Sequence, residues 1–388
     1  MSYQPDPTRM SCAGHLTIDL GALQNNWRAL KARVGEACDC AAVVKANAYG
    51  LGVDHVVPAL SAAGAGTFFV ATPEEGQEVR ALVPDAPIYV LSGVFTGRLA
   101  LYDDAALRPI LGHPDEISEW ARFCEAKGET LPAGLHIDTG MNRLGLTHAQ
   151  AEALANDSQL LRAFDLTLVM SHLACADDRD SPLNRQQLAA FERGSALFPG
   201  VPRSLANSSG VFLGADYHFE LVRPGIALYG GNPTPKAATP MRCVATIEAE
   251  VIHLRDVSPG EAVGYGATRT AERPTRIATV NVGYADGMHR LVGSTDERDG
   301  AFASVGGIRC PLFGRVSMDM LAIDVTDVPE GTVVRGSRVE VMGPTISVDE
   351  LAEAALTIPY ELLTALGARY KRSYIGYTQN GEDALTHG

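Results

Sequence analysis

Residues 19–45, DLGALQNNWRALKARVGEACDCAAVVK, contain in order a helical pattern, a short apolar run and a lysine. In the first part the apolar residues are spaced four, three and four positions apart, as in the stripe of an amphipathic helix: Leu23, Trp27, Leu30 and Val34. The run from Cys40 to Val44 is continuously apolar, which is typical of a β-strand buried on both faces. This combination decides the fold because it recurs along the chain.

Eight short apolar runs precede residue 223, at 40–44, 67–71, 88–91, 108–111, 135–137, 166–170, 204–206 and 219–222. Helical patterns alternate with several of them, as at 73–82, 115–126 and 182–198. Alternation of helices with strands buried on both faces predicts a parallel sheet. Eight such units in about 200 residues fit a (β/α)8 TIM barrel better than an open doubly wound sheet.

The composition changes after Tyr229, where residues 230–240 (GGNPTPKAATP) read as a linker. Beyond it come β-rich segments separated by Pro/Gly turns, with no long helix before 348–355: 245–253, 277–282, 303–311, 320–325 and 338–342. We therefore predict an α/β protein with a TIM barrel over residues 1–240 and a mainly-β domain over 241–388. Residues 1–18 are candidates to pack on the second domain, and 379–388 should form a loose tail.

Composition excludes several classes of partner. The net charge of −14, from 32 Lys plus Arg against 46 Asp plus Glu, repels nucleic acids and anionic membranes. The seven cysteines show neither disulfide-rich nor zinc-type spacing, which predicts a reducing cytoplasm and no metal site. We expect no signal peptide and no membrane span, because the first fourteen residues lack an apolar segment and no uncharged stretch is long and uninterrupted.

The candidate chemistry lies where the predicted strands end, because TIM barrels build their active sites there. The residues that follow the runs are Lys45, the segment 138–143, Ser171 with His172, Asn207 with Ser208, and Arg223 with Gly225. A lysine at the end of a buried strand can be partly desolvated, which lowers its pKa and frees the amine to attack a carbonyl. The last two loops are built of small residues that let backbone N–H groups approach an anion. A lysine opposite a phosphate site indicates pyridoxal phosphate.

The chain resembles the alanine racemases, the barrel-type (fold type III) pyridoxal-phosphate enzymes, over nearly its whole length. Nine ordered blocks carry this resemblance: VVKANAYGLG (43–52), HIDTGMNRLGL (136–146), SHLACAD (171–177), LANSSG (205–210), VRPGIALYG (222–230), VGYGATRTA (263–271), VGYADG (282–287), GRVSMDM (314–320) and TIPYEL (357–362). Taken singly, His172, Tyr265, Tyr284 and Met318 also suit structural roles, and only the joint pattern favours the functional ones.

The resemblance implies a role for each matching residue. Lys45 would carry the cofactor, Arg223 would face its pyridine nitrogen, and Arg143 its phenolic oxygen. The phosphate would be held by Tyr49, Ser208, the backbone of Gly225 and Ile226, and Tyr360, with Asn207 beside them. Tyr265 would be the second catalytic base with His172 next to it, and Met318, Tyr284 and Arg143 would hold the substrate carboxylate. The resemblance also implies a homodimer in which Tyr265 and Met318 of one chain complete the site of the other.

These roles suit racemisation of L- and D-alanine, which needs two acid/base groups on opposite faces of the α-carbon. A free tyrosine has a pKa near 10, so Tyr265 would need stabilisation by positive charge or hydrogen bonds, which His172 and Arg223 can supply. An arginine at the pyridine nitrogen keeps its own proton and leaves the ring a weaker electron sink, which limits side reactions.

One position departs from the family. Many relatives carry a carbamylated lysine two residues before the aspartate of the DTGM motif, where this chain has His136. A carbamate is excluded there, and how Arg143 is held is left open, with His136, Asn142 and a bound anion as candidates.

Three other functions compete with alanine racemisation. A non-catalytic pyridoxal-phosphate-binding barrel would lack the second domain that bears Tyr265. A fold type III amino-acid decarboxylase usually places a carboxylate where this chain has Arg223. A racemase of serine or of a broader range is a closer alternative, although such relatives are usually exported. The sequence leaves open the alanine-to-serine preference, the biosynthetic or catabolic direction, and the permanence of the dimer.

Overall fold

The computed structural model describes residues 14–235 and 237–376. The contacts divide them into two compact units. The barrel unit consists of Leu23–Leu228 with the described part of Asn232–Met241. The β unit consists of the described residues up to Ala22, Tyr229–Gly231 and the described residues from Arg242 onward.

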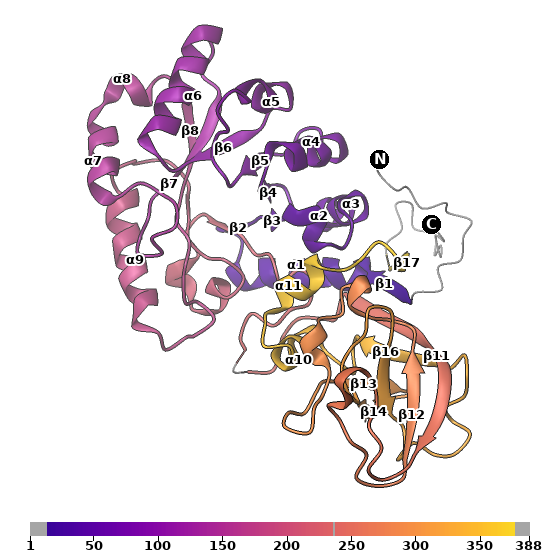
Figure 1. The fold of residues 1–388 in the computed structure, drawn as a ribbon. Coiled ribbons are helices and arrows are strands. Elements are labelled where there is room, and N and C mark those ends of the chain that lie inside the picture. The colour runs from indigo at the N-terminus through magenta and orange to yellow at the C-terminus, as the bar shows by residue number, and fades with distance from the viewer. Residues whose placement is uncertain (1–13, 236, 377–388) are drawn as a thin grey trace. The chain divides into compact units, whose positions relative to one another are not determined.

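The barrel unit is built on parallel strands (Figure 1). Seven strands pair in the order β3-β4-β5-β6-β7-β8-β9, and β10 pairs with β2. Their bounds are β2 (Asp39–Cys40), β3 (Ala42–Val43), β4 (Phe68–Val70), β5 (Ile88–Val90), β6 (Arg108–Leu111), β7 (Pro132–His136), β8 (Asp165–Met170), β9 (Arg203–Ser204) and β10 (Leu221–Val222). All residues of β4 and β5 are buried, as the continuously apolar runs predict.

Hydrogen bonds close these strands into a barrel. The N–H of Ala41 donates to Val222, and that of Ala42 donates to Thr67, so β2 and β3 form one strand position with a neighbour on each side. Between β9 and β10 the backbone N–H of Arg223 donates to Ala206 over 2.9 Å. The eight predicted apolar runs therefore correspond to eight strand positions, and the predicted TIM barrel is confirmed.

Helices surround the barrel strands (Figure 1). They are α1 (Leu20–Val34), α2 (Lys45–Tyr49), α3 (Val53–Ala63), α4 (Pro73–Leu82), α5 (Leu99–Asp104), α6 (Pro114–Lys127), α7 (His148–Asn156), α8 (Ser158–Leu161) and α9 (Pro182–Ser195), with short 3₁₀ turns at Gly210–Phe212 and Ala215–Tyr217. The starts of α4 and α6 are fixed in the same way: proline occupies the first turn, and a capping box joins Thr72 to Glu75 and His113 to Glu116. The predicted helices at 19–34, 73–82, 115–126 and 182–198 are confirmed.

The β unit contains an eight-stranded sheet with the order β14-β13-β16-β11-β1-β17, and β12 joins β11 to β15. Its elements are β1 (His15–Asp19), β11 (Ala245–Val257), β12 (Thr275–Val280), β13 (Phe302–Val305), β14 (Ile308–Pro311), β15 (Leu321–Asp324), β16 (Arg338–Met342), β17 (Lys371–Ile375), α10 (Val348–Ala354) and α11 (Pro359–Thr364). The N-terminal strand β1 runs antiparallel to β11 and parallel to β17. A mainly-β second domain is thus confirmed.

The predicted β-rich segment 303–311 is a hairpin of β13 and β14, because Gly306 and Gly307 adopt φ of 57° and 83° between them. Two consecutive residues with positive φ match the tight turn of a two-residue hairpin. The predicted tail at 379–388 lies outside the described residues. In the part of the chain that the structure describes, no helix is both long and apolar enough to cross a membrane.

Candidate active site

Lys45 begins a strained turn. Strand β3 ends at Val43, and the short α2 that follows is left-handed: Ala46, Asn47, Ala48 and Tyr49 have φ between 52° and 54°. The left-handed conformation costs roughly 1–2 kcal/mol for each non-glycine residue. Strain of this kind persists only where the surrounding structure imposes it, and it concentrates at functional sites.

Backbone and side-chain hydrogen bonds hold this turn. The N–H of Gly50 donates to the carbonyl of Ala46 over 2.8 Å, and that of Leu51 to Ala48 over 3.1 Å. The N–H of Val53 donates to Oδ1 of Asn47 over 2.8 Å, which joins the turn to the start of α3. Asparagine tolerates positive φ better than most residues, so it suits this position.

The amine of Lys45 is half-buried and electrostatically tuned. Burial lowers its pKa, the positive charge of Arg143 lowers the pKa further, and the Glu75 carboxylate acts in the opposite direction. A lowered pKa increases the fraction of neutral amine, which is the form that attacks a carbonyl carbon.

A cradle of small groups lies at the ends of β9 and β10. The hydroxyl of Ser208 accepts from the N–H of Gly225 over 2.9 Å and from that of Ala227 over 3.2 Å. A Cβ on Gly225 would lie 2.1 Å from the hydroxyl of Tyr49, so any other residue here would displace the Tyr49 side chain. Ile226 between the two donors is buried. Hydroxyls and backbone N–H groups gathered around a glycine suit the oxygens of a phosphate.

Arg223 is buried beside this cradle, with 4% of its surface exposed. Its Nη2 donates to the carbonyl of Ser171 over 2.6 Å, and its Nη1 donates to the hydroxyl of Ser204. Burial lowers the pKa of Arg223 to about 9, so the guanidinium keeps its charge at neutral pH. The buried arginine is thus a fixed positive group.

Two histidines near this charge are neutral. Burial lowers the pKa of His172 to about 3, with further lowering by Arg223 and Arg143. Burial also lowers the pKa of His136 to about 4, with Arg223 the next cause. His172 can therefore offer a hydrogen bond to a neighbouring group but no positive charge, which refines the role expected from sequence.

The loop 138–143 is shaped by its aspartate. Oδ1 of Asp138 accepts from the N–H groups of Gly140, Met141 and Asn142 over 3.0, 3.0 and 3.1 Å. Asn142 adopts a φ of 57°, and Arg143 after it is exposed. The structure thus places Arg143 at the rim, where its charge acts on both Lys45 and His172.

Gln187 of α9 is a supporting residue that sequence reasoning missed. Its side chain is fully buried. Nε2 donates to the carbonyl of His172 over 2.9 Å and to the hydroxyl of Thr139 over 3.2 Å, while Oε1 accepts from Ala174 over 2.8 Å. Gln187 thus ties the segment after β7 to the segment after β8. The only signal in the sequence is a glutamine on the apolar side of a helical pattern.

The side chain of Asn207 makes hydrogen bonds with nearby backbone groups. Its Oδ1 accepts from the N–H of Gly210 over 2.9 Å, and its Nδ2 donates to the carbonyl of Leu173 over 3.5 Å. These bonds fix the loop that presents Ser208.

In the β unit, the predicted site residues are exposed and lie on short loops. Tyr265 is 71% exposed, Met318 53% and Tyr284 43%. Tyr265 begins a 3₁₀ turn between Gly264 and Gly266, both with positive φ. Tyr360 in α11 is also exposed.

The loops of Tyr284 and Met318 are joined to each other. The N–H of Tyr284 donates to Ser317 over 3.0 Å, and a Cβ on Gly283 would lie 2.3 Å from the carbonyl of Met318. Arg369 clamps the two loops: it donates to both carboxylate oxygens of the buried Asp286, over 2.6 and 2.8 Å, and to Asp319 over 2.7 Å.

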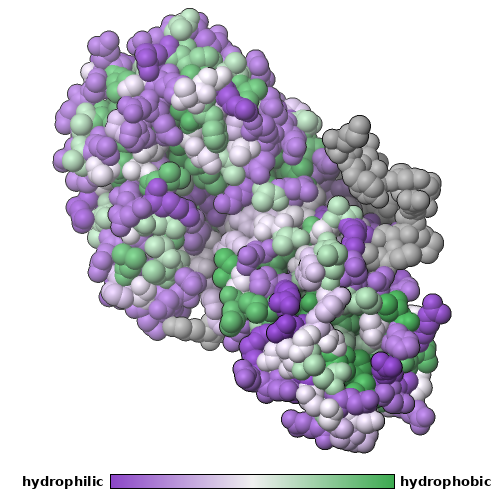
Figure 2. Space-filling model, in the orientation of Figure 1, coloured by the Kyte–Doolittle hydropathy of each residue, from purple (hydrophilic) through white to green (hydrophobic). Residues whose placement is uncertain are grey.

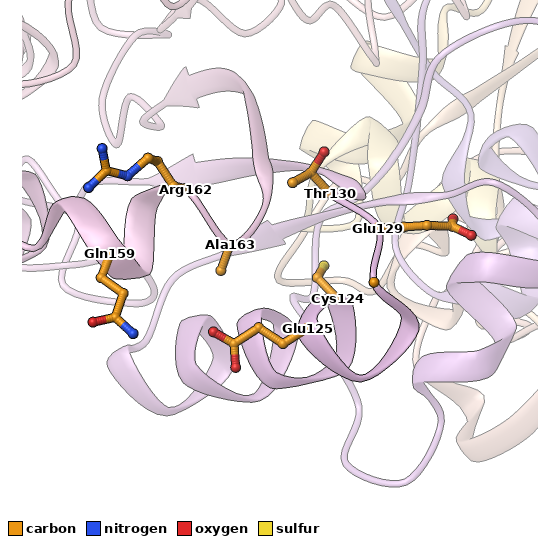
Figure 3. A pocket seen from close by; sticks show the side chains of 8 residues that line it. Cys124, Glu125, Glu129, Thr130, Gln159, Arg162 and Ala163 are labelled. Atoms are coloured by element: carbon orange, nitrogen blue, oxygen red, sulfur yellow. The ribbon is translucent and has the colours of Figure 1, made fainter.

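The outside of the barrel unit has a separate hollow of about 760 Å³ between the end of α6 and α8 (Figure 3). Its lining includes Cys124, Glu125 and Arg162 and none of the predicted site residues. Burial raises the pKa of the Cys124 thiol, which keeps it protonated and unreactive.

The fold and the barrel mouth define a class of enzyme: a TIM barrel whose lysine can condense with an aldehyde and whose last two loops can hold a phosphate. The family models for the alanine racemase N-terminal and C-terminal domains match residues 18–233 and 244–374. The alanine racemase of Rhodospirillum rubrum is 50% identical over 362 residues, which are 93% of this chain and 96% of the relative.

Solved structures agree. The alanine racemase of Bartonella henselae "with covalently bound pyridoxal phosphate" is 38% identical with a TM-score of 0.87, covering 94% of this chain and 99% of that one. The biosynthetic alanine racemase of Pseudomonas aeruginosa is 40% identical with a TM-score of 0.85, over 93% and 99% of the two chains. This chain belongs to the alanine racemase family, whose members are isomerases.

Proposed function

We propose that this chain racemises alanine with pyridoxal phosphate bound at the mouth of its barrel. Membership of the family supports the reaction. The observation that carries the site is the cluster of charged groups at the strand ends. The charge of Arg143 lowers the pKa of Lys45. The charges of Arg223, Arg143 and Lys45 all lower the pKa of His172. A lysine amine with a lowered pKa and a buried fixed charge both suit this cofactor, whose aldehyde needs a neutral amine and whose ring nitrogen needs a partner.

The residues of the barrel fit the cofactor part by part. Lys45 would hold its aldehyde carbon, and Arg223 would contact the ring nitrogen as a donor that keeps its proton. The phosphate would be held by Tyr49, Ser208, the N–H groups of Gly225 and Ile226, and Tyr360, with Asn207 shaping the loop. When bound, pyridoxal phosphate acidifies the α-hydrogen of an amino acid.

Two bases would then move the proton. Lys45 serves one face of the α-carbon and Tyr265 the other, because inversion requires removal and return on opposite sides. Neutral His172 would donate a hydrogen bond to Tyr265, and Arg223 would supply the nearby charge. Arg143, Met318 and Tyr284 would hold the substrate carboxylate.

The exposed β-unit residues support a homodimer with composite sites. Large side chains at 43% to 71% exposure on well-fixed loops are suited to burial against another surface.

We further propose the cytoplasm as the compartment, since the six cysteines described by the structure are all free thiols.

A substrate panel tests the proposal. Purified protein is incubated with L-alanine, L-serine and other amino acids, and chiral chromatography measures each enantiomer. We expect alanine to be racemised fastest, and Lys45→Ala to abolish both racemisation and covalent retention of the cofactor. Lys127→Ala, in an ion pair with Asp103 on the outer helices, is the matched control and should behave as wild type. Racemisation by Lys45→Ala, or retention of cofactor on another lysine after borohydride, would contradict the assignment.

A further inference from the structure

Glu75 has contacts that extend beyond its own helix. It is the third residue of α4 and completes the capping box with Thr72. Its Oε2 accepts from the N–H of Ala71 over 2.7 Å and from that of Thr72 over 3.4 Å. Its Oε1 accepts from the N–H of Ala46 over 2.8 Å. One carboxylate therefore joins the end of β4 to the turn after β3.

Ala46 is the first left-handed residue of that turn and directly follows Lys45. Inside the turn, the carbonyls of Ala46, Asn47 and Ala48 accept hydrogen bonds from the following residues, whereas the N–H of Ala46 donates to Glu75. A helical turn of either hand leaves its first N–H groups without internal acceptors, so an outside acceptor is needed. Glu75 supplies it at the residue where the strained conformation starts.

The same carboxylate acts on the Lys45 amine through its charge. Burial and Arg143 lower the pKa of Lys45, and Glu75 raises it. Glu75 thus partly offsets the lowering of the Lys45 pKa, in addition to accepting a hydrogen bond from the backbone beside the lysine.

The chain repeats this arrangement away from Lys45. Glu116 is the third residue of α6, completes a capping box with His113, and accepts from Gly112 over 2.7 Å. It also receives a backbone hydrogen bond from Val94 in the loop after β5. Glu116 therefore provides an internal control, because its loss removes a bridge of the same design from a loop that carries no candidate catalytic group.

We infer that Glu75 is a positioning residue for Lys45: its carboxylate fixes the left-handed turn 46–49 and so sets the place from which the lysine amine acts. The inference rests on the proposed function for its consequence in catalysis. Its contacts are properties of the cofactor-free chain and can be measured without it.

The test uses cofactor-free full-length protein. Hydrogen exchange followed by mass spectrometry reports on the peptide 41–52 in wild type, Glu75→Gln and Glu75→Asp. Glutamine offers one acceptor oxygen in place of two, and aspartate keeps the charge but shortens the reach. Both should speed exchange at Ala46 on the order of tenfold, as expected when an N–H loses a charged acceptor. Glu74→Gln, which alters the exposed neighbour paired with Arg98, and Glu116→Gln should leave this peptide unchanged.

A second measurement reads the lysine itself. Reductive methylation of Lys45 is followed over pH by mass spectrometry, with Lys127 as internal reference. The midpoint should move to lower pH in Glu75→Gln and stay near the wild-type value in Glu75→Asp, Glu74→Gln and Glu116→Gln. If Glu75→Gln fails to fold, the exchange of Glu75→Asp decides the matter. Hydrogen exchange in 41–52 equal to wild type in both Glu75 variants would overturn the inference. The proposed function is tested separately, by measuring racemisation and cofactor retention in Lys45→Ala.

Discussion

The barrel mouth and the loops of the β unit hold their candidate residues in opposite ways. In the barrel, Tyr49, Ser208, Arg223 and Ile226 are buried, and the first three have partners from neighbouring strand ends. In the β unit, Tyr265, Tyr284 and Met318 stand exposed, although the backbones of Tyr284 and Met318 are joined by hydrogen bonds and by a close approach at Gly283. Figure 2 shows hydrophobic residues gathered on the visible face of the β unit.

This difference separates two tasks. Holding a cofactor requires groups that do not move, and burial among strand ends provides that rigidity. Completing a site around a substrate that enters and leaves requires groups that remain accessible until the site forms. Under the proposed function, the exposed side chains of Tyr265, Tyr284 and Met318 would meet this need.

Of the changes that test this difference between the two units, we expect the largest effect from removing Tyr265, the exposed candidate base. Tyr265→Ala should lower racemisation by about 10²–10⁴-fold, the usual contribution of a positioned acid/base group. Exchange of the α-hydrogen with deuterium from solvent should survive for D-alanine, which the family resemblance places on the lysine face, and be lost for L-alanine. NMR of each enantiomer in deuterated buffer measures this. Equal loss for both enantiomers would contradict the division of labour between the two bases.

A smaller effect is expected from loosening the loop backbones. Arg369→Met leaves the fully buried Asp286 carboxylate with the N–H of Gly283 as a remaining donor, and should destabilise the β unit by about 1–3 kcal/mol, the usual cost of removing a partner from a buried acceptor. Arg338→Met, which breaks an exposed pair with Glu248, should cost at most about 1 kcal/mol. Denaturant unfolding compares them. Equal values would show that the clamp does not fix the loops.

The smallest effect concerns the barrel histidine that replaces the modifiable lysine. The folded pKa of His136, about 4, lies below the value near 6.5 of an unfolded histidine, so the unfolded chain binds the proton first as pH falls. Stability is therefore lost as pH decreases below about 6.5. His136→Gln should reduce the loss between pH 7 and pH 5 by about 1–2 kcal/mol in denaturant unfolding. An unchanged pH dependence would mean that His136 is protonated in the native state. Because His136 cannot form a carbamate, added bicarbonate should not alter the rate of racemisation.

Much of the fold could be predicted because its signals are local. Continuously apolar runs marked the strands, and the residues just after them marked Lys45, His172 and Arg223 as neighbours. The segment 303–311 was predicted as β-rich, and the structure resolves it into a hairpin around Gly306 and Gly307.

The rest depends on contacts between distant segments. Alanine prefers the right-handed conformation, so nothing in residues 46–49 predicts four consecutive left-handed residues. The first N–H of the turn, that of Ala46, donates to Glu75, which lies 29 positions further along the chain. Gln187 likewise shows its role only when α9 packs against the segments after β7 and β8.

One mixing experiment tests most directly whether the exposed half of one chain completes the barrel of another. Lys45→Ala and Tyr265→Phe chains, each inactive alone, are coexpressed. If the site is composite, each mixed dimer has one site with both bases and one with neither, and random pairing should restore about a quarter of wild-type racemisation. If both bases of a site come from one chain, every site lacks a base, and the mixture would be as inactive as its parents.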